Sequence, residues 1–178
     1  MTVYSLTVFL HISSTLILFF AFGIEWTAIS FLGKAQNADE ASLWLRLAKL
    51  APVINGPALL VAILSGGYLA SVINAFKQGW VSASFVGIAV VALIGGAINV
   101  PKMRAIRDAI SHGGTALTVA LQTRALPVSV RLRTFTTLAI VFMMVVKPWS
   151  FAQSLLVLLG GLILGLLFSI PAFAHKAA

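Results

Sequence analysis

Residues 3–32 read VYSLTVFLHISSTLILFFAFGIEWTAISFL, and this stretch decides the fold class. His11 and Glu25 are its only acidic or basic side chains, and at 1.5 Å per residue a helix of this length crosses a bilayer. Further apolar runs follow at about residues 52–76, 80–100, 131–146 and 151–173. The sequence therefore predicts an all-α polytopic membrane protein, in which residues 1–178 form one domain with five transmembrane helices.

The composition agrees with a membrane protein and excludes several other classes. Hydrophobic residues make up 60% of the chain, charged residues 9%, and the mean hydropathy is +1.06, which no ordinary soluble domain shows. The absence of cysteine excludes disulfide chemistry, thiolate metal sites and covalent attachment of haem through thiols. The net charge of +8 comes mostly from Lys and Arg between the apolar runs, where they act as topology signals. We therefore expect lipid, and not nucleic acid, as the partner.

The connections between the apolar runs have distinct patterns. Residues 35–51 predict a short amphipathic helix on the membrane surface, ahead of a second transmembrane helix that begins at Pro52. The helix of residues 80–100 is expected to continue past Pro101 with a kink, as a basic amphipathic stretch that Gly113-Gly114 ends. Residues 115–126 predict another amphipathic segment.

The distribution of basic residues predicts the orientation. Of the 12 Lys and Arg residues, two lie on one predicted side, Lys77 and Lys147. The others lie on the opposite side: Lys34, Arg46, Lys49, Lys102, Arg104, Arg107, Arg124, Arg131, Arg133 and Lys176. This asymmetry predicts a cytoplasmic C-terminus and an external N-terminus, consistent with an odd number of spans. The first apolar run lacks a basic leader and a cleavage signal, and is expected to be retained.

His11 is the one histidine expected at membrane depth, where ionisable groups are costly and usually functional. One interpretation is a structural hydrogen bond to a carbonyl, a hydroxyl or Tyr68. The other is a ligand to haem b or copper, or a proton acceptor. Depth counting brings Tyr68, Met143 and Met144 near its level, and an imidazole with a thioether, His11 with Met143, suits Cu(I) or haem iron. Lys147 either snorkels to the interface or pairs with a propionate or another anion.

Glu25 shares one helical stripe with His11, but about 14 residues of helix, roughly 20 Å, separate them. They are therefore expected to belong to different sites. Glu25 either pairs with Lys or Arg from the basic connections, or forms a proton or substrate site with Asn55 and Asn99, which depth counting places at the same level.

The last apolar run contains a small-x-x-x-small pattern formed by Gly161 and Gly165. Such a pattern lets two helix backbones approach closely, either within the bundle or between chains. We expect it to pack helices inside the bundle, or to form a homodimer or a contact in a larger membrane complex.

Short motifs in roughly the first 110 residues carry a family resemblance. These motifs are Phe9-Leu10-His11-Ile12, Pro57, Leu64-Ser65-Gly66-Gly67-Tyr68-Leu69, Trp80 and Pro101-Lys102-Met103-Arg104. Over this part the chain resembles bacterial integral membrane proteins distantly related to copper-resistance D proteins and to the HemJ-type haem-pathway oxidase. The resemblance implies a helical bundle in the bacterial cytoplasmic (inner) membrane with His11 as a candidate ligand. Unlike the HemJ-type arrangement, no lysine lies at mid-membrane, since Lys102 and Lys147 fall at helix ends.

Three functions follow as alternatives. The first is a membrane bundle that binds haem or copper near the outer leaflet through His11, for redox chemistry or metal handling. The second is a non-catalytic accessory or scaffold subunit of a membrane complex. The third is a small proton-coupled transporter that uses Glu25. No hydrolase triad or paired carboxylate can be assembled from four acidic residues and three scattered histidines.

Overall fold

The structure is a computed structural model that describes residues 2–112 and 114–170, and within these ranges every regular element is helical. The elements are α1 (Val3–Leu32), α2 (Ala38–Val72), the 3-10 turn η1 (Ala75–Lys77), α3 (Gly79–Ile94), the π-helical turn η2 (Gly95–Asn99), α4 (Val100–His112), α5 (Gly114–Leu121), α6 (Ala125–Val146) and α7 (Phe151–Leu167). The all-α prediction is confirmed for this part of the chain.

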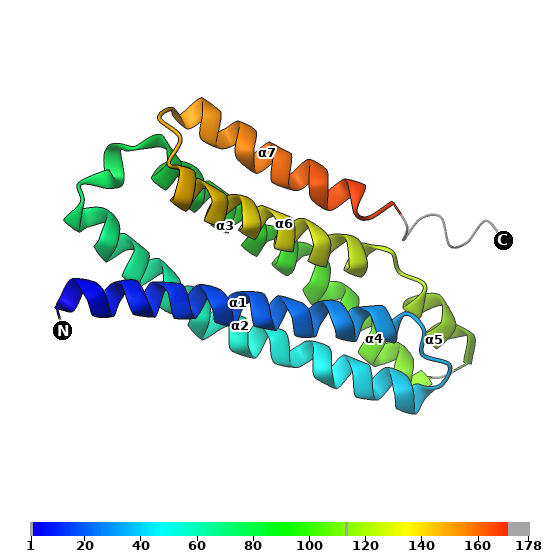
Figure 1. Cartoon of the computed structure of the whole chain (residues 1–178). Helices are drawn as coiled ribbons and strands as arrows, with labels where there is room; N and C mark the ends of the chain where they lie inside the picture. The colour runs from blue at the N-terminus through cyan, green and yellow to red at the C-terminus, as the bar shows by residue number, and fades with distance from the viewer. Residues whose placement is uncertain (1, 113, 171–178) are drawn as a thin grey trace.

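The long helices form two layers (Figure 1). α1 and α2 are an antiparallel pair, while α3, α6 and α7 form a second group that contacts the pair mainly through α1 and α6. α2 packs extensively on α1 but only marginally on α3. A long space therefore remains between α2 and α3, with α1 and α6 behind it.

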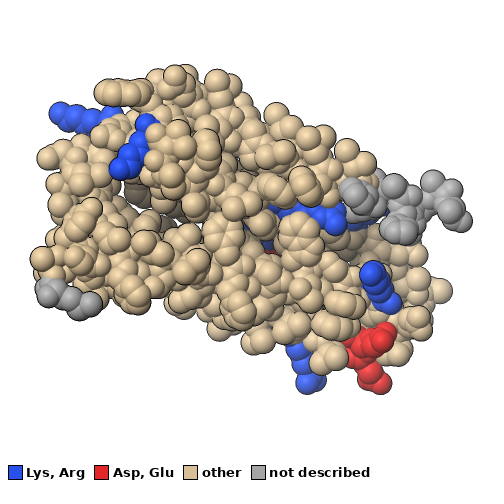
Figure 2. Space-filling model, viewed as in Figure 1, with Lys and Arg blue, Asp and Glu red and all other residues tan. Residues whose placement is uncertain are grey.

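The two ends of the bundle differ in charge. The start of α1, the α2–α3 connection and the α6–α7 turn lie at one end, which we name the lysine end after Lys77 and Lys147. The opposite end, named the basic end, is formed by the α1–α2 connection, α4, α5 and the start of α6. Its basic residues are Lys34, Arg46, Lys49, Lys102, Arg104, Arg107, Arg124 and Arg131. Charged side chains on the face in Figure 2 likewise gather toward the ends.

Four helical segments are long and apolar enough to cross a membrane: Val3–Leu32, Ala38–Val72, Gly79–His112 and Gly114–Val146. α7 is also apolar but shorter, with 17 residues. Many large apolar side chains point outward, such as Phe9, Phe20 and Leu64, each about 65% exposed. Such a surface matches lipid and not water, so the prediction of a helical membrane bundle is confirmed.

The predicted boundary at Pro52 is wrong, because α2 is one helix of 35 residues that contains both Pro52 and Pro57. The Asn37 side chain caps it by accepting a hydrogen bond from the Glu40 N–H at 2.9 Å. One face of the segment expected to lie on the membrane surface packs inside the basic end, while its other face is exposed. The apolar side chains of the packed face join a core with residues of α1, α4, α5 and α6: Ile29, Leu32, Ala41, Leu45, Ile106, Leu117, Leu126 and Val130.

The helix of α3 and α4 changes its winding before Pro101. In η2 the Val100 N–H donates to the Gly95 carbonyl, a π-helical bond that inserts extra backbone into the helix. α6 begins at Ala125, six residues before the predicted start, because Leu126, Ser129 and Val130 are buried against the basic-end core. The described part of α7 ends at Leu167, and the rest of its predicted range after residue 170 lies outside the described residues.

Candidate functional site

Three cavities follow one another along the space between α2 and α3. The lysine-end cavity, about 340 Å³, includes His11, Met144 and Lys147 in its lining. The central cavity, about 280 Å³, shares His11 and Met144 with it and extends to Asn55 and Arg133. The basic-end cavity, about 310 Å³, shares Arg133 with the central one. The face drawn in Figure 2 is hollowed between the two helix layers toward the lysine end. His11 and Arg133 thus stand at the two junctions of a row of cavities.

His11 has one ring nitrogen bound and the other available. Its Nδ1 lies 3.0 Å from the Ala62 carbonyl oxygen and 3.2 Å from Ser65 Oγ. Because a carbonyl only accepts, Nδ1 carries the proton and donates, so in the neutral ring Nε2 keeps its lone pair. Nε2 forms no hydrogen bond with the residues that the structure describes. This is the arrangement in which a histidine serves as a metal ligand, with a backbone carbonyl fixing its tautomer.

Gly66 on α2 sets the position of the His11 ring. A Cβ atom at Gly66 would lie 2.8 Å from His11 Cε1, closer than a real Cβ contact, and 3.2 Å from its Nδ1, so glycine lets this edge of the ring approach α2 here. A Cβ at the neighbouring Gly67 would meet nothing within 4 Å. The first of the two glycines therefore serves the His11 site, and the second does not.

The other predicted ligands are divided between the cavities and the core. Met144 and Lys147 line the lysine-end cavity with His11. Met143 is fully buried in a separate core that includes Trp80 and Leu158, and it lines none of these three cavities. Tyr68 is 42% exposed and also lines none of them. The thioether that shares a cavity with His11 is therefore that of Met144, because Met143 lies one residue, or 100°, around the helix.

A second polar group lies at the junction of the central and basic-end cavities. Glu25 is 2% exposed, and its Oε1 accepts hydrogen bonds from Arg133 Nη1 at 2.8 Å and from Asn99 Nδ2 at 2.5 Å. The Arg133 guanidinium also lies over the Phe22 ring, 5.2 Å from its centroid. This is the one buried ion pair among the described residues, because the other pair, Arg107 with Asp108, is exposed.

Of the three residues grouped in the sequence, Glu25, Asn55 and Asn99, the structure brings two together, while the role of this group stays a prediction. Glu25 and Asn99 meet as expected, and Glu25 also has the basic partner that the alternative interpretation required. That partner is Arg133, which the charge pattern places among the basic residues that flank the apolar runs. Asn55 does not bond to this group; it lines the central cavity with Arg133, and both of its amide atoms are buried without a partner. Helical spacing was a usable signal, since Arg133 precedes Thr136, Ile140 and Met143 on the buried face of α6.

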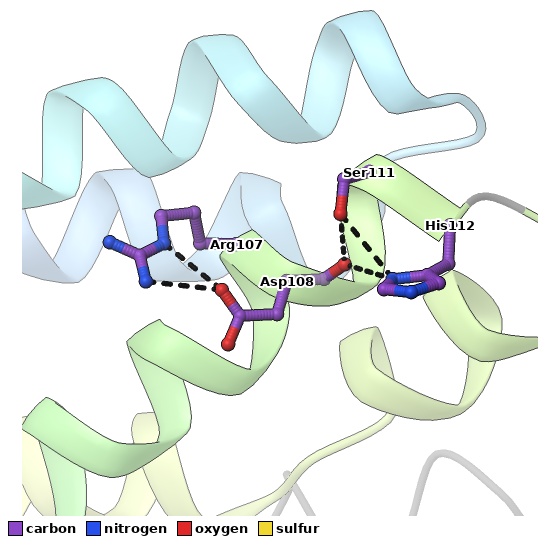
Figure 3. A network of polar contacts seen from close by, with 4 residues as sticks. All are labelled: Arg107, Asp108, Ser111 and His112. Atoms are coloured by element: carbon purple, nitrogen blue, oxygen red, sulfur yellow. Dashed lines mark hydrogen bonds and ion pairs between the residues drawn. The ribbon is translucent and has the colours of Figure 1, made fainter.

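His112 lies on the surface of α4 and belongs to no cavity. Figure 3 shows it with Asp108, Ser111 and Arg107 at the exposed basic end. His112 Nδ1 lies 2.7 Å from the Asp108 carbonyl oxygen, one turn earlier in the helix, and Arg107 pairs with the Asp108 carboxylate at 3.1 Å. This group is local to one helix and so separate from the buried sites.

Gly161 and Gly165 pack α7 on α6 within the chain. A Cβ at Gly161 would lie 2.8 Å from the Ala139 Cβ, and one at Gly165 would lie 2.9 Å from the Leu132 Cα. Both glycines are buried. Of the two roles predicted for this pattern, the contact inside the bundle is the one that the structure displays.

Within residues 2–112 and 114–170, no group of three or more His, Cys, Asp or Glu side chains is placed to hold a metal ion. The donors available near His11 are thus an imidazole and a thioether. Comparison of the chain with protein-family models, with curated proteins and with solved structures found no match.

Proposed function

We propose that the protein holds a haem b or copper cofactor in its membrane bundle through His11, and acts in redox chemistry or metal handling. The observation that carries this proposal is the bonding of the His11 ring. Its Nδ1–H is held by the Ala62 carbonyl, and its Nε2 is left for a ligand in cavities that Met144 also lines.

The residues present fit such a group. Imidazole nitrogen and thioether sulfur are the donor types that bind Cu(I), and the same pair binds the iron of many haems. His11 on α1 and Met144 on α6 belong to opposite helix layers, so a ligand between them would join the layers. Lys147 in the same lining would pair with the carboxylate of a haem propionate. The cofactor would supply the electron transfer or the bound ion, while these residues bind and orient it.

The first test is the visible absorption spectrum and the metal content of the full chain, purified in mild detergent from a membrane that supplies both haem and copper. We expect a Soret band or about one copper per chain, lost in His11→Ala and weakened in Met144→Leu. His112→Ala removes an exposed histidine and is the matched control, expected to keep the wild-type content. A wild-type protein without colour or metal would contradict the proposal, as would an unchanged content in folded His11→Ala.

A second candidate function is proton-coupled transport through the row of cavities. Its support is that Arg133, the ion-pair partner of Glu25, lies where the central and basic-end cavities meet. Protonation of Glu25 would weaken its bond to Arg133 and would let the two side chains separate. Acid-driven flux across proteoliposomes that stops in Glu25→Gln would support this function. Its absence for every solute tested in the wild type would refute it.

We also propose an orientation for the protein and the membrane in which it lies. The greater number of basic residues at the basic end supports a cytoplasmic location for that end, with α7 as the fifth crossing. The resemblance of the motifs around His11 supports the bacterial inner membrane. An accessory role in a larger complex remains a third proposal, which co-purification of a stable partner from native membranes would support.

A further inference from the structure

The basic-end cavity has a composition that the functions above leave unexplained. Three cations line it, Lys49, Arg104 and Arg133, together with one carboxylate, Glu25, so it carries two excess positive charges. Glu25 already neutralises Arg133. Lys49 and Arg104 are exposed at the rim and form no ion pair within the part of the chain that the structure describes. The rim is therefore suited to an anionic group.

The floor of the same cavity needs hydrogen-bond donors more than acceptors. Glu25 Oε2 and Asn99 Oδ1 are buried acceptors without a partner, and Arg133 Nε is a buried donor without one. The residues Glu25, Asn99 and Arg133 are 2%, 7% and 9% exposed, and the side chain of Arg133 is 11% exposed. Buried polar atoms are nearly always bonded. These atoms are covered as the side chains stand, and their residues line the cavity, so a small rotation of the side chains would offer them to a ligand or water. A ligand that satisfies both the floor and the rim therefore carries an anionic group. In addition, it carries hydroxyl or ammonium groups that donate hydrogen bonds.

An apolar route leads from this cavity into the bundle. Pro52, Gly95 and Arg133 line both the basic-end and the central cavity. The central cavity continues between α2 and α3 past Leu59 and Val91. Because α2 and α3 barely pack on each other, the route lies where a membrane lipid would approach. From Arg133 to Met144 the helix rises about 16 Å, a length that the greater part of an acyl chain fills.

We propose that the basic-end cavity binds the headgroup of an anionic phospholipid with hydroxyl donors, of the phosphatidylglycerol type. The phosphate lies at Lys49 and Arg104, the headgroup hydroxyls donate to Glu25 Oε2 and Asn99 Oδ1, and one acyl chain occupies the central cavity. The headgroup site is separate from His11, whereas the far end of the central cavity, which the acyl chain occupies, is also lined by His11 and Met144. The charge contacts at Lys49 and Arg104 do not depend on a cofactor at His11.

The test measures lipid binding to the full chain in mild detergent by native mass spectrometry, with phosphatidylglycerol as the probe. We expect Lys49→Gln/Arg104→Gln to weaken binding at least tenfold, because two phosphate contacts are lost. The matched control is Arg46→Gln/Lys102→Gln, which removes the same charge from the same two helices at exposed positions outside the cavity. The control is expected to bind as the wild type does. If both double variants weakened lipid binding equally, the loss would be explained by the lower net charge alone. That result would overturn the proposed site.

Three further probes test the chemistry of the ligand. Phosphatidylmethanol has the same charge without headgroup hydroxyls, and we expect it to bind roughly tenfold more weakly than phosphatidylglycerol. Phosphatidylcholine, which lacks both net charge and donors, is expected to bind more weakly still. Binding of either lipid as tight as that of phosphatidylglycerol would overturn the proposal. Displacement of the lipid by equimolar glycerol phosphate would also overturn it, because the site would then take a free phosphate ester.

Discussion

Glu25 and Arg133 illustrate how one buried ion pair constrains a bundle that is otherwise apolar. Each charge loses its hydration inside the protein, and their mutual attraction offsets this cost only while both are present. The 2.8 Å contact and the added bond from Asn99 supply that compensation. Removal of one partner is therefore expected to cost more than removal of both.

We predict that Arg133→Leu lowers the free energy of unfolding by about 3–5 kcal/mol, since it leaves the buried Glu25 carboxylate unpaired. The double variant Glu25→Gln/Arg133→Leu should recover most of this loss. Reversible unfolding in mixed micelles, followed by circular dichroism, measures both values. Arg107→Leu breaks the exposed pair with Asp108, whose side chains are 59% and 62% exposed, and should change stability very little. A double variant as unstable as Arg133→Leu would show that the pair is not the cause.

At the His11 site we predict opposite effects for two adjacent glycines. Gly66→Ala places a Cβ against the imidazole and should displace the ring, destabilising the protein by about 1–3 kcal/mol and weakening any ligand bound at His11. Gly67→Ala meets no atom within 4 Å, and should be neutral or slightly stabilising because alanine favours the helix. Thermal unfolding of the two variants measures the difference in stability between them. Equal effects would mean that the ring does not rest on Gly66.

Single polar residues in apolar helices could be predicted from the sequence, whereas their partners were harder to assign. His11 and Glu25 stand out because nothing else in residues 3–32 is acidic or basic. Arg133 lies only two residues from Arg131 near the predicted helix start, so its charge resembled a flanking topology signal. Arg133 lies beside Gly95 of η2, with its Nε 3.4 Å from where a Gly95 Cβ would be, which is an ordinary packing distance. Such a contact between distant segments has no local signature.

At the level of the helices, proline was the reason that a predicted boundary was wrong. Pro52 and Pro57 each remove a backbone hydrogen bond, which usually ends a helix, yet α2 continues through both. Its partner α1 runs antiparallel along it, and the buried residues Ala48, Ala51 and Ala58 lie on both sides of Pro52. Packing on both sides of a proline thus compensates the lost bond. Between α3 and α4, the π-helical turn η2 ends just before Pro101, so the helix changes its winding at the place where a kink was expected.

The contact of α6 with α7 depends on the glycines of α7, and we predict a sharp contrast between neighbours. Gly161→Ala would bring a Cβ within 2.9 Å of the Phe135 carbonyl oxygen, a backbone atom that cannot rotate away, and should lower thermal stability by several degrees. Gly160→Ala meets nothing within 4 Å and should leave the melting temperature unchanged or raise it. Thermal unfolding in detergent, followed by circular dichroism, compares the melting temperatures of the two variants. Similar melting temperatures would show that α7 does not pack closely on α6.

In the whole molecule, two cores hold the ends of the bundle while the middle stays open between α2 and α3. One core joins α3, α6 and α7 near the lysine end, around Met143 and Leu158. The other joins α1, α2 and α4 at the basic end, around Leu32 and Ile106. The long helices carry apolar outer faces, and cationic residues follow or begin several of them at the basic end. The space between α2 and α3 and the apolar outer faces thus belong to one arrangement of the helices.

The orientation can be tested cleanly because the chain contains no cysteine, so any introduced thiol is the only one. We predict that an impermeant maleimide labels Trp149→Cys, a position 97% exposed at the lysine end, in intact bacterial cells. Gln36→Cys and Gln122→Cys, both exposed at the basic end, should react only after the membrane is permeabilised. Ala178→Cys should behave like these two if α7 is the fifth crossing. Labelling of Ala178→Cys from outside would mean that the chain crosses the membrane four times. A reversed pattern at Gln36 and Trp149 would mean that the topology is inverted, because the basic end would then face outward, against the bias of its charges.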